Sequence, residues 1–169
     1  LKETWPAEPD RFLEHHIDPF LLWCVKKGAS DITFQSNRPV FSEIHGTLYP
    51  STYRSLDAAD MSAVLVKLYG TEALAILAGG ADIDLSYEVM TDRFTRTRFR
   101  VNMTAILADG RDGVQVTMRT LPSAPPTMKQ LNIEQEIINH WKPRQGLVLV
   151  TGPTGSGKST LLAAGNRML

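Results

Sequence analysis

The sequence predicts an α/β protein that contains a mixed α/β domain, a proline-rich linker and the first strand, phosphate-binding loop and helix of a second α/β domain. Three observations support this prediction. The spacing of apolar residues switches between the helical period of 3.6 and the strand period of two, prolines cluster between the two regions, and a glycine-rich phosphate-loop motif stands near the end. The 169 residues are enough for one average domain and too few for two complete ones.

The composition is that of an ordinary globular protein, with 43% hydrophobic and 21% charged residues. Eighteen basic residues balance eighteen acidic ones, which argues against direct nucleic-acid binding and against a membrane surface held by bulk charge. The longest apolar runs, Phe20–Val25 and Ala73–Ala78, are too short to span a membrane. One cysteine, Cys24, excludes a disulfide framework and favours a reducing, cytoplasmic location.

The first helix is predicted to follow an N-terminal arm, residues 1–16, in which prolines prevent helix formation. Asp18 has the character of an N-cap and Pro19 stands at the first helical position. Two strand-forming runs come next, Asp31–Gln35 and Val40–Leu48. The turn residues between these runs predict a hairpin.

Two further helices and three further strands complete the first domain, residues 17–120. One helix is predicted to begin at Asp57 and another at Thr71, and glycines end both. Apolar and polar residues then alternate along three strands that each have one solvated face, over Ile83–Val89, Thr95–Met103 and Val114–Arg119.

Residues 121–127 are predicted to be a stiff linker, because three prolines in five residues cannot join a central strand or a helix interior. Residues 128–169 are predicted to contain a helix near Asn132–Trp141, a strand over Leu147–Val150 and a helix from about Gly157. Such a strand and helix cannot bury their apolar side alone. Five side chains are therefore expected to stay exposed unless they dock on residues 1–120 or on another chain: Leu147, Leu149, Leu161, Leu162 and Met168.

The segment from Gly152 to Ser159 matches the phosphate-loop pattern G-x-x-x-x-G-K-[ST] at every fixed position. Glycines let backbone N–H groups wrap phosphate oxygens, and the N-terminus of the following helix adds partial positive charge. Lys158 is expected to reach the β- and γ-phosphates of ATP, and the Ser159 hydroxyl to ligate Mg²⁺. The predicted nucleotide-binding residues are Gly152, Pro153, Thr154, Gly155, Ser156, Gly157, Lys158, Ser159 and Thr160.

Five short segments of the first region carry further motifs: ASDIT at 29–33, EIHG at 43–46, DLSYE at 84–88, RFRVN at 98–102 and RTLP at 119–122. Together with the phosphate loop, these segments resemble the secretion and pilus ATPases of the PilT/GspE/VirB11 superfamily. The resemblance covers residues 17–165. The segment Trp5–Pro9 resembles one branch, the DotB-like ATPases of Dot/Icm type IVB secretion and the TraJ-like ATPases of IncI-type plasmid conjugation.

The resemblance implies a PAS-like N-terminal domain and a RecA-like ATPase domain that assemble as a homohexamer at the cytoplasmic face of a membrane secretion, conjugation or pilus complex, peripherally recruited to the inner membrane. It implies hydrolysis of ATP with Mg²⁺. It also implies that arginines of the N-terminal domain reach the nucleotide phosphates, the candidates being Arg98, Arg100, Arg111 and Arg119. The residues themselves leave another interpretation open, in which these arginines form a solvated strand face that pairs with Asp82, Asp84 or Glu88.

A P-loop ATPase also needs an acid for Mg²⁺ and an acid that orients the attacking water. In the family that the chain resembles, both follow well after the phosphate loop, whereas this sequence ends at Leu169. The chain is therefore expected to contain half of an active site and to hydrolyse no ATP by itself. Two other functions stay open: a non-catalytic assembly or docking module with an incomplete P-loop, and a different P-loop class such as a small-molecule kinase.

Overall fold

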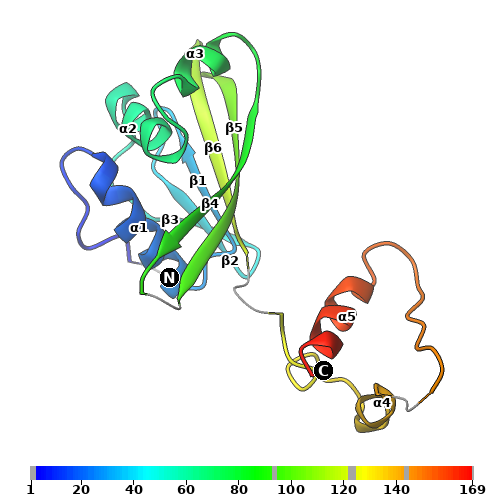
Figure 1. Ribbon diagram of the computed structural model, residues 1–169. Helices are drawn as coiled ribbons and strands as arrows, with labels where there is room; N and C mark the ends of the chain where they lie inside the picture. Colours follow the sequence, from blue (N-terminus) through cyan, green and yellow to red (C-terminus); the bar gives the residue numbers. More distant parts are fainter. Residues whose placement is uncertain (1–2, 93–94, 122–124, 143–144, 169) are drawn as a thin grey trace. The chain divides into compact units, whose positions relative to one another are not determined.

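Figure 1 shows a computed structural model of the chain, which describes residues 3–92, 95–121, 125–142 and 145–168. The chain divides into two compact units, Leu1–Leu121 and Pro122–Leu169. Part of the predicted linker, residues 122–124, lies outside the described residues.

The first unit is a six-stranded antiparallel sheet with three helices on one face (Figure 1). This architecture confirms the predicted mixed α/β class. The strand order across the sheet is β3-β2-β1-β6-β5-β4. The strands are β1 (Asp31–Gln35), β2 (Phe41–Ile44), β3 (Thr47–Pro50), β4 (Ile83–Met90), β5 (Arg96–Ala108) and β6 (Arg111–Leu121), and the helices are α1 (Glu14–Lys26), α2 (Ala58–Leu68) and α3 (Ala73–Ala78).

Alternation along the strands gives the sheet one buried face and one polar face. On β5, Phe99 and Val101 are fully buried, whereas Arg98 and Arg100 between and beside them are exposed. The buried side chains join those of α1 and α2 in a single core. The three predicted alternating strands are confirmed as β4, β5 and β6. The last two run longer than predicted because they pair with each other over eleven successive residues.

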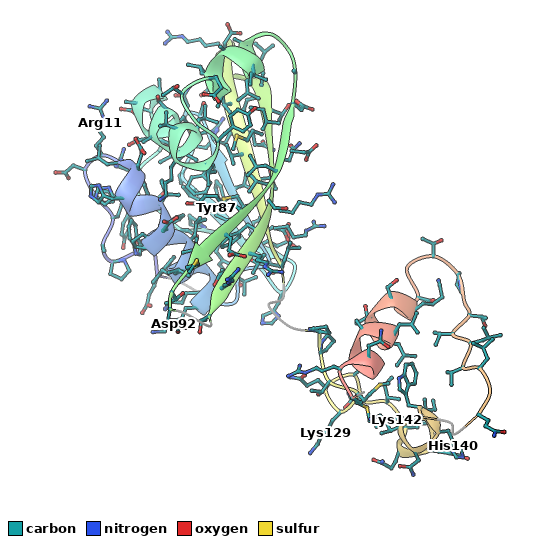
Figure 2. The ribbon with its side chains drawn as sticks, viewed as in Figure 1. Arg11, Tyr87, Asp92, Lys129, His140 and Lys142 are labelled. Atoms are coloured by element: carbon teal, nitrogen blue, oxygen red, sulfur yellow. The ribbon has the colours of Figure 1, made fainter. Side chains whose placement is uncertain are left out.

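The first helix begins earlier than predicted. α1 starts at Glu14, with Leu13 as its N-cap, so Pro19 lies inside the helix and Asp18 is not a cap. The reason is packing: Ile17 belongs to the same fully buried stripe as Phe20, and a helix that started at Pro19 would leave Ile17 out of that stripe. The Asp18 carboxylate instead accepts a hydrogen bond from the hydroxyl of Tyr87 at 2.6 Å (labelled in Figure 2) and pairs with the Lys67 ammonium at 2.9 Å.

The predicted strand Val40–Leu48 is two strands, β2 and β3, joined by a tight turn. β1 and β2 do form the predicted hairpin. His45 and Gly46 have φ angles of 50° and 75°, and Ile44 pairs with Thr47 directly across the turn. Two successive residues with positive φ make the tight two-residue connection that suits the twist of a hairpin. The alternation of Val40–Leu48 alone predicts one strand, whereas the positive φ angles of His45 and Gly46 divide it into two.

The predicted start of the second helix is confirmed. The side chain of Asp57 accepts hydrogen bonds from the backbone N–H groups of Ala59 and Asp60, both at 2.8 Å, and so caps α2. The third helix, α3, begins at Ala73 and ends before Gly79, close to the predicted bounds. Among the described residues, no helix has the length and apolar character that crossing a membrane requires.

A fully buried carboxylate, that of Asp60, ties three segments together. It accepts two hydrogen bonds from the Arg54 guanidinium at 2.7 and 2.9 Å. It also accepts the backbone N–H groups of Phe12 at 2.7 Å and of Asp57 at 3.0 Å. Burial alone would raise the pKa of Asp60, but Arg54 and the two N–H groups outweigh it and hold that pKa below its usual value.

We expect Asp60→Asn to lower the free energy of unfolding by about 3 kcal/mol, because the amide has no charge to pair with the Arg54 guanidinium and only one acceptor oxygen for the four hydrogen bonds that the carboxylate accepts. Urea unfolding at pH 7 measures this loss. The folded-state pKa is depressed, so the contribution is present above about pH 4, the unfolded value, and disappears as the pH falls through the folded value. The exposed control Asp82→Asn should change stability little, and an equal loss in both variants would contradict the assignment.

Cys24 lies in the core of the first unit with 1% of its surface exposed. Burial raises the pKa of its thiol to about 12, so almost no thiolate is present at pH 8. We expect a disulfide reagent to label the native chain at least about a hundredfold more slowly than the urea-unfolded chain at that pH. Complete labelling within minutes in native buffer would contradict this packing.

The second unit contains α4 (Gln135–His140), a long loop and α5 (Lys158–Asn166). The strand predicted over Leu147–Val150 is not formed, because the described part of this unit offers no other strand for it to pair with. α4 is shorter than the predicted helix. Of the five apolar side chains predicted to be exposed, four are: Leu147 (79%), Leu149 (74%), Leu162 (42%) and Met168 (38%).

Leu161 is the exception, since it is half-buried against a small cluster formed by Met128, Trp141 and Ala164. The indole of Trp141 lies directly against Gly165, where any side chain would occupy the space of the ring. A local core of this kind buries one side of α5 and leaves the rest of the unit's apolar surface open.

Candidate nucleotide-binding site

The predicted phosphate loop leads directly into α5 (Figure 1). Gly157 is the N-cap of this helix and has a φ angle of 85°. Gly152 and Gly155 also have positive φ angles, of 150° and 82°. At Gly152 a Cβ atom would in addition lie 2.9 Å from the Oγ of Ser156. The backbone of the loop therefore favours glycine at the two positions that the motif specifies, 152 and 157, and also at position 155.

Lys158 folds back over the loop that precedes it. Its Nζ donates a hydrogen bond to the carbonyl oxygen of Pro153 at 2.6 Å, and the backbone N–H of Ser156 donates to the same oxygen at 3.3 Å. Ser159 and Thr160 follow in the first turn of α5, and both are exposed. One short segment thus brings together a lysine ammonium, two hydroxyl groups and the N–H groups of a helix N-terminus, which are the donors that phosphate oxygens accept.

A groove of about 340 Å³ adjoins the loop. Its lining combines apolar side chains, those of Leu131, Ile133 and Leu161, with the polar groups of Lys158 and Thr160. Such a groove has room for an apolar ligand group next to the donors of the loop.

Three of the four predicted arginines lie together on the polar face of the sheet in the first unit. Arg100 on β5 is directly opposite Arg119 on β6, and Arg98 is two residues further along β5. Arg111 lies at the other end of β6, eight residues from Arg119, which corresponds to about 26 Å at 3.3 Å per residue. The structure therefore does not bring Arg111 together with the other three.

Carboxylates hold several of the arginines on this face. Glu88 accepts from Arg96 at 3.1 Å and from Arg98 at 3.0 Å, and Asp31 accepts from the Nε of Arg119 at 2.8 Å. The solvated ion-pair interpretation is thus confirmed for Arg98 with Glu88. Asp84 instead accepts from the amide of Asn102 at 3.3 Å.

The ion pair of Asp31 with Arg119 could not be predicted from the sequence. The two residues are 88 positions apart, and only the pairing of β1 with β6 brings them together. Arg100 differs from its neighbours: within the described residues it makes no ion pair, and it is exposed. It contributes instead to a shallow pocket of about 300 Å³ lined by Asp31, Asp84, Arg100, Asn102, Thr117 and Arg119.

We expect Glu88→Gln to change the free energy of unfolding by less than about 1 kcal/mol, although it removes two ion pairs. The reason is solvent screening, since the Arg96 and Arg98 side chains are 49% and 56% exposed. Urea unfolding at low ionic strength provides the measurement. A loss as large as that expected for the buried Asp60 would show that Glu88 has a structural role.

The glycine geometry of the loop, the lysine folded over it and the helix that follows are the features expected of the P-loop class. Comparison with known families narrows this class. The family of type II/IV secretion system proteins matches residues 7–169, and the chain belongs to that family.

Individual relatives agree with this assignment. The type IV pilus retraction ATPase PilT of Pseudomonas aeruginosa is 31% identical over 148 residues, which are 88% of this chain and 41% of PilT. The crystal structure of the ATPase DotB of Legionella pneumophila matches 98% of this chain and 45% of its own, with a TM-score of 0.86 and 41% identity. The crystal structure of the pilus retraction motor PilT with bound ADP matches 90% of this chain and 42% of its own chain, with a TM-score of 0.65 and 27% identity.

The chain spans less than half the length of these relatives. The predicted resemblance to the PilT/GspE/VirB11 superfamily and to its DotB-like members is confirmed.

Proposed function

We propose that this chain is the N-terminal part of a hexameric ATPase that binds and hydrolyses ATP to power a secretion, conjugation or pilus machine at the cytoplasmic face of a membrane. The observation that carries the proposal is the loop itself, in which three glycines with positive φ and the Lys158 ammonium precede a helix N-terminus. The family supports it, because the relatives are named as ATPases and one was solved with ADP.

In the proposed site, different residues of the loop bind different parts of ATP and its Mg²⁺. The backbone N–H groups from Gly152 to Thr160 would donate to phosphate oxygens, and Lys158 would exchange its bond to the Pro153 carbonyl for one to the β- and γ-phosphates. The exposed Ser159 hydroxyl fits a ligand of Mg²⁺, which when bound draws negative charge from the phosphates. The apolar lining residues of the adjoining groove would accommodate the base.

Arginines of the first unit are proposed to add positive charge at the phosphates of ATP. Arg100 is the best placed, since it makes no ion pair within the described residues. Arg98 and Arg119 donate only their Nε to carboxylates, so their terminal amino groups can still bind an oxygen anion in two-point geometry. Arg111 is also proposed to reach phosphate, but its distance along β6 means that it would contact a different part of the nucleotide or another nucleotide.

Within the family we favour type IVB secretion, on the 41% identity to DotB over nearly the whole chain. Conjugation by a TraJ-like machine and pilus dynamics are the neighbouring possibilities. In each, the complete protein would be recruited to the inner membrane from the cytoplasm as a homohexamer, and the linker at residues 121–127 would transmit motion between the units.

We expect Lys158→Ala in the complete protein to weaken ATP binding at least about tenfold and to abolish turnover, because the alanine cannot contact phosphate oxygens. Titration with a non-hydrolysable ATP analogue and a phosphate-release assay measure the two effects. Lys129→Ala is the matched control, since Lys129 is an exposed lysine of the same unit (Figure 2). Unchanged binding and turnover in Lys158→Ala would favour the non-catalytic assembly module instead.

We expect residues 1–169 alone to release no phosphate from ATP in steady state, because the acids that hold Mg²⁺ and orient the attacking water are not supplied by this segment of the family. A coupled phosphate assay on the purified chain tests this. Steady release that disappears in Lys158→Ala would show that the segment contains a complete active site.

A further inference from the structure

The two edges of the sheet in the first unit differ in a way that matters for binding. β3 forms one edge, with four residues that end at Pro50. β4 forms the other edge, with eight residues paired to β5 without interruption and with neither proline nor lysine. Natural edge strands are usually short, or are interrupted by proline, lysine or a bulge, because a long regular edge pairs readily with another strand. β4 is a long, regular edge of the kind that pairs readily with another strand.

The register with β5 determines which backbone groups of β4 point outward. The N–H of Thr91 donates to the carbonyl oxygen of Thr95 at 3.1 Å, and these residues continue the β4–β5 pairing by one step. Thr91 and Thr95 are therefore a hydrogen-bonded pair, and such pairs alternate with non-bonded pairs along an antiparallel ladder. It follows that the odd-numbered residues of β4 bond to β5. The even-numbered residues point their N–H and C=O groups away from β5: Asp84, Ser86, Glu88 and Met90.

No strand of the described chain pairs with this outer side of β4. The side chains of the four outward-facing residues are exposed as well, and the Met90 side chain is 62% exposed. On the opposite face of the same strand, Leu85 and Tyr87 pack against the core but are only half-buried, so each keeps some exposed surface. An added strand would thus find backbone partners, a polar face and an apolar face.

The charges along β4 are of one sign. Asp82, Asp84 and Glu88 are acidic, and residues 82–90 include no lysine or arginine. Glu88 is already paired with two arginines, but Asp82 and Asp84 make no ion pair within the described residues. Like charges directly opposite each other across a ladder are destabilising, which disfavours a second copy of β4 and favours a strand with basic side chains.

We propose that the outer edge of β4 is a docking site for an extended segment of a partner protein, in which basic and apolar side chains alternate. The segment adds to the sheet as a seventh strand. Its backbone bonds to Asp84, Ser86, Glu88 and Met90, its basic side chains pair with Asp82 and Asp84, and its apolar side chains pack beside Leu85 and Tyr87. The phosphate loop has no part in this site.

The probe for this site is a fluorescein-labelled ten-residue peptide that alternates lysine with valine, and its control alternates glutamate with valine. Fluorescence anisotropy with the whole chain should show at least about tenfold tighter binding of the lysine peptide, and the difference should shrink as salt screens the carboxylates. Equal binding of the two peptides would overturn the proposal.

Amide hydrogen exchange followed by NMR tests the geometry without any variant. On addition of the lysine peptide, the amides of Ser86 and Glu88 should exchange at least about tenfold more slowly, because they gain acceptors. Those of Leu85 and Tyr87 should change little, because they already donate to β5. Protection spread evenly over both sets, or absent from both, would overturn the proposal.

Ser86→Pro removes one outward N–H and no bond to β5, and prolines are tolerated at such edge positions. We expect it to weaken peptide binding at least about tenfold, while the matched control Ser86→Ala stays within about twofold. Undiminished binding to a folded Ser86→Pro chain would refute the site, and if that variant does not fold, the exchange experiment on the wild type decides. Lys158→Ala should leave peptide binding unchanged, so this proposal and the proposed ATPase function can fail separately.

Discussion

The two-residue period of the β5–β6 hairpin is the constraint on which the first unit depends. Every second side chain of these two long strands, such as Phe99 and Met118, must face the core, and this fixes where the helices pack. The intervening side chains therefore form the opposite face, where Arg100 on β5 lies directly across from Arg119 on β6. A shift of one residue in the register would exchange the two faces completely. The apolar core and the arginine face are consequences of one pairing.

Carboxylate–arginine pairs act differently in the two environments that this sheet creates. In the interior, Asp60 and Arg54 join the N-terminal segment to α2, and the pair is costly to break because the Asp60 carboxylate is fully buried and would lose its charged partner without gaining water. On the polar face, the pair of Asp31 with Arg119 is solvated and contributes little to stability. What it does is orient a guanidinium whose terminal amino groups remain available. The same chemistry therefore holds the fold at one site and orients an exposed guanidinium at the other.

In the second unit, the glycine-rich loop and α5 are formed although the described residues of this unit contain no strand. The loop around Gly155 and the start of α5 depend only on neighbouring residues, so they adopt the geometry that the motif requires. The segment Leu147–Val150 has a strand sequence, but strand hydrogen bonds need a second strand, and the described unit offers none. Its two leucines, Leu147 and Leu149, are exposed, because the described residues of the unit offer no sheet that would bury them.

The sequence by itself determined the features whose physical cause is local. The phosphate loop follows from the φ angles that only glycine tolerates, the start of α2 from the capping side chain of Asp57, and the strands β4 to β6 from alternation. Only the tertiary structure decided where α1 begins, because the burial of Ile17 moves the start to Glu14, ahead of Pro19. It also decided the partner of Arg119, because the pairing of β1 with β6 brings Asp31 to it. It also decided that Arg111 lies at the far end of β6 from Arg119, and that the backbone N–H and C=O of Ser86 point away from β5. These outcomes depend on register and packing between residues far apart in the chain, and no local pattern encodes them.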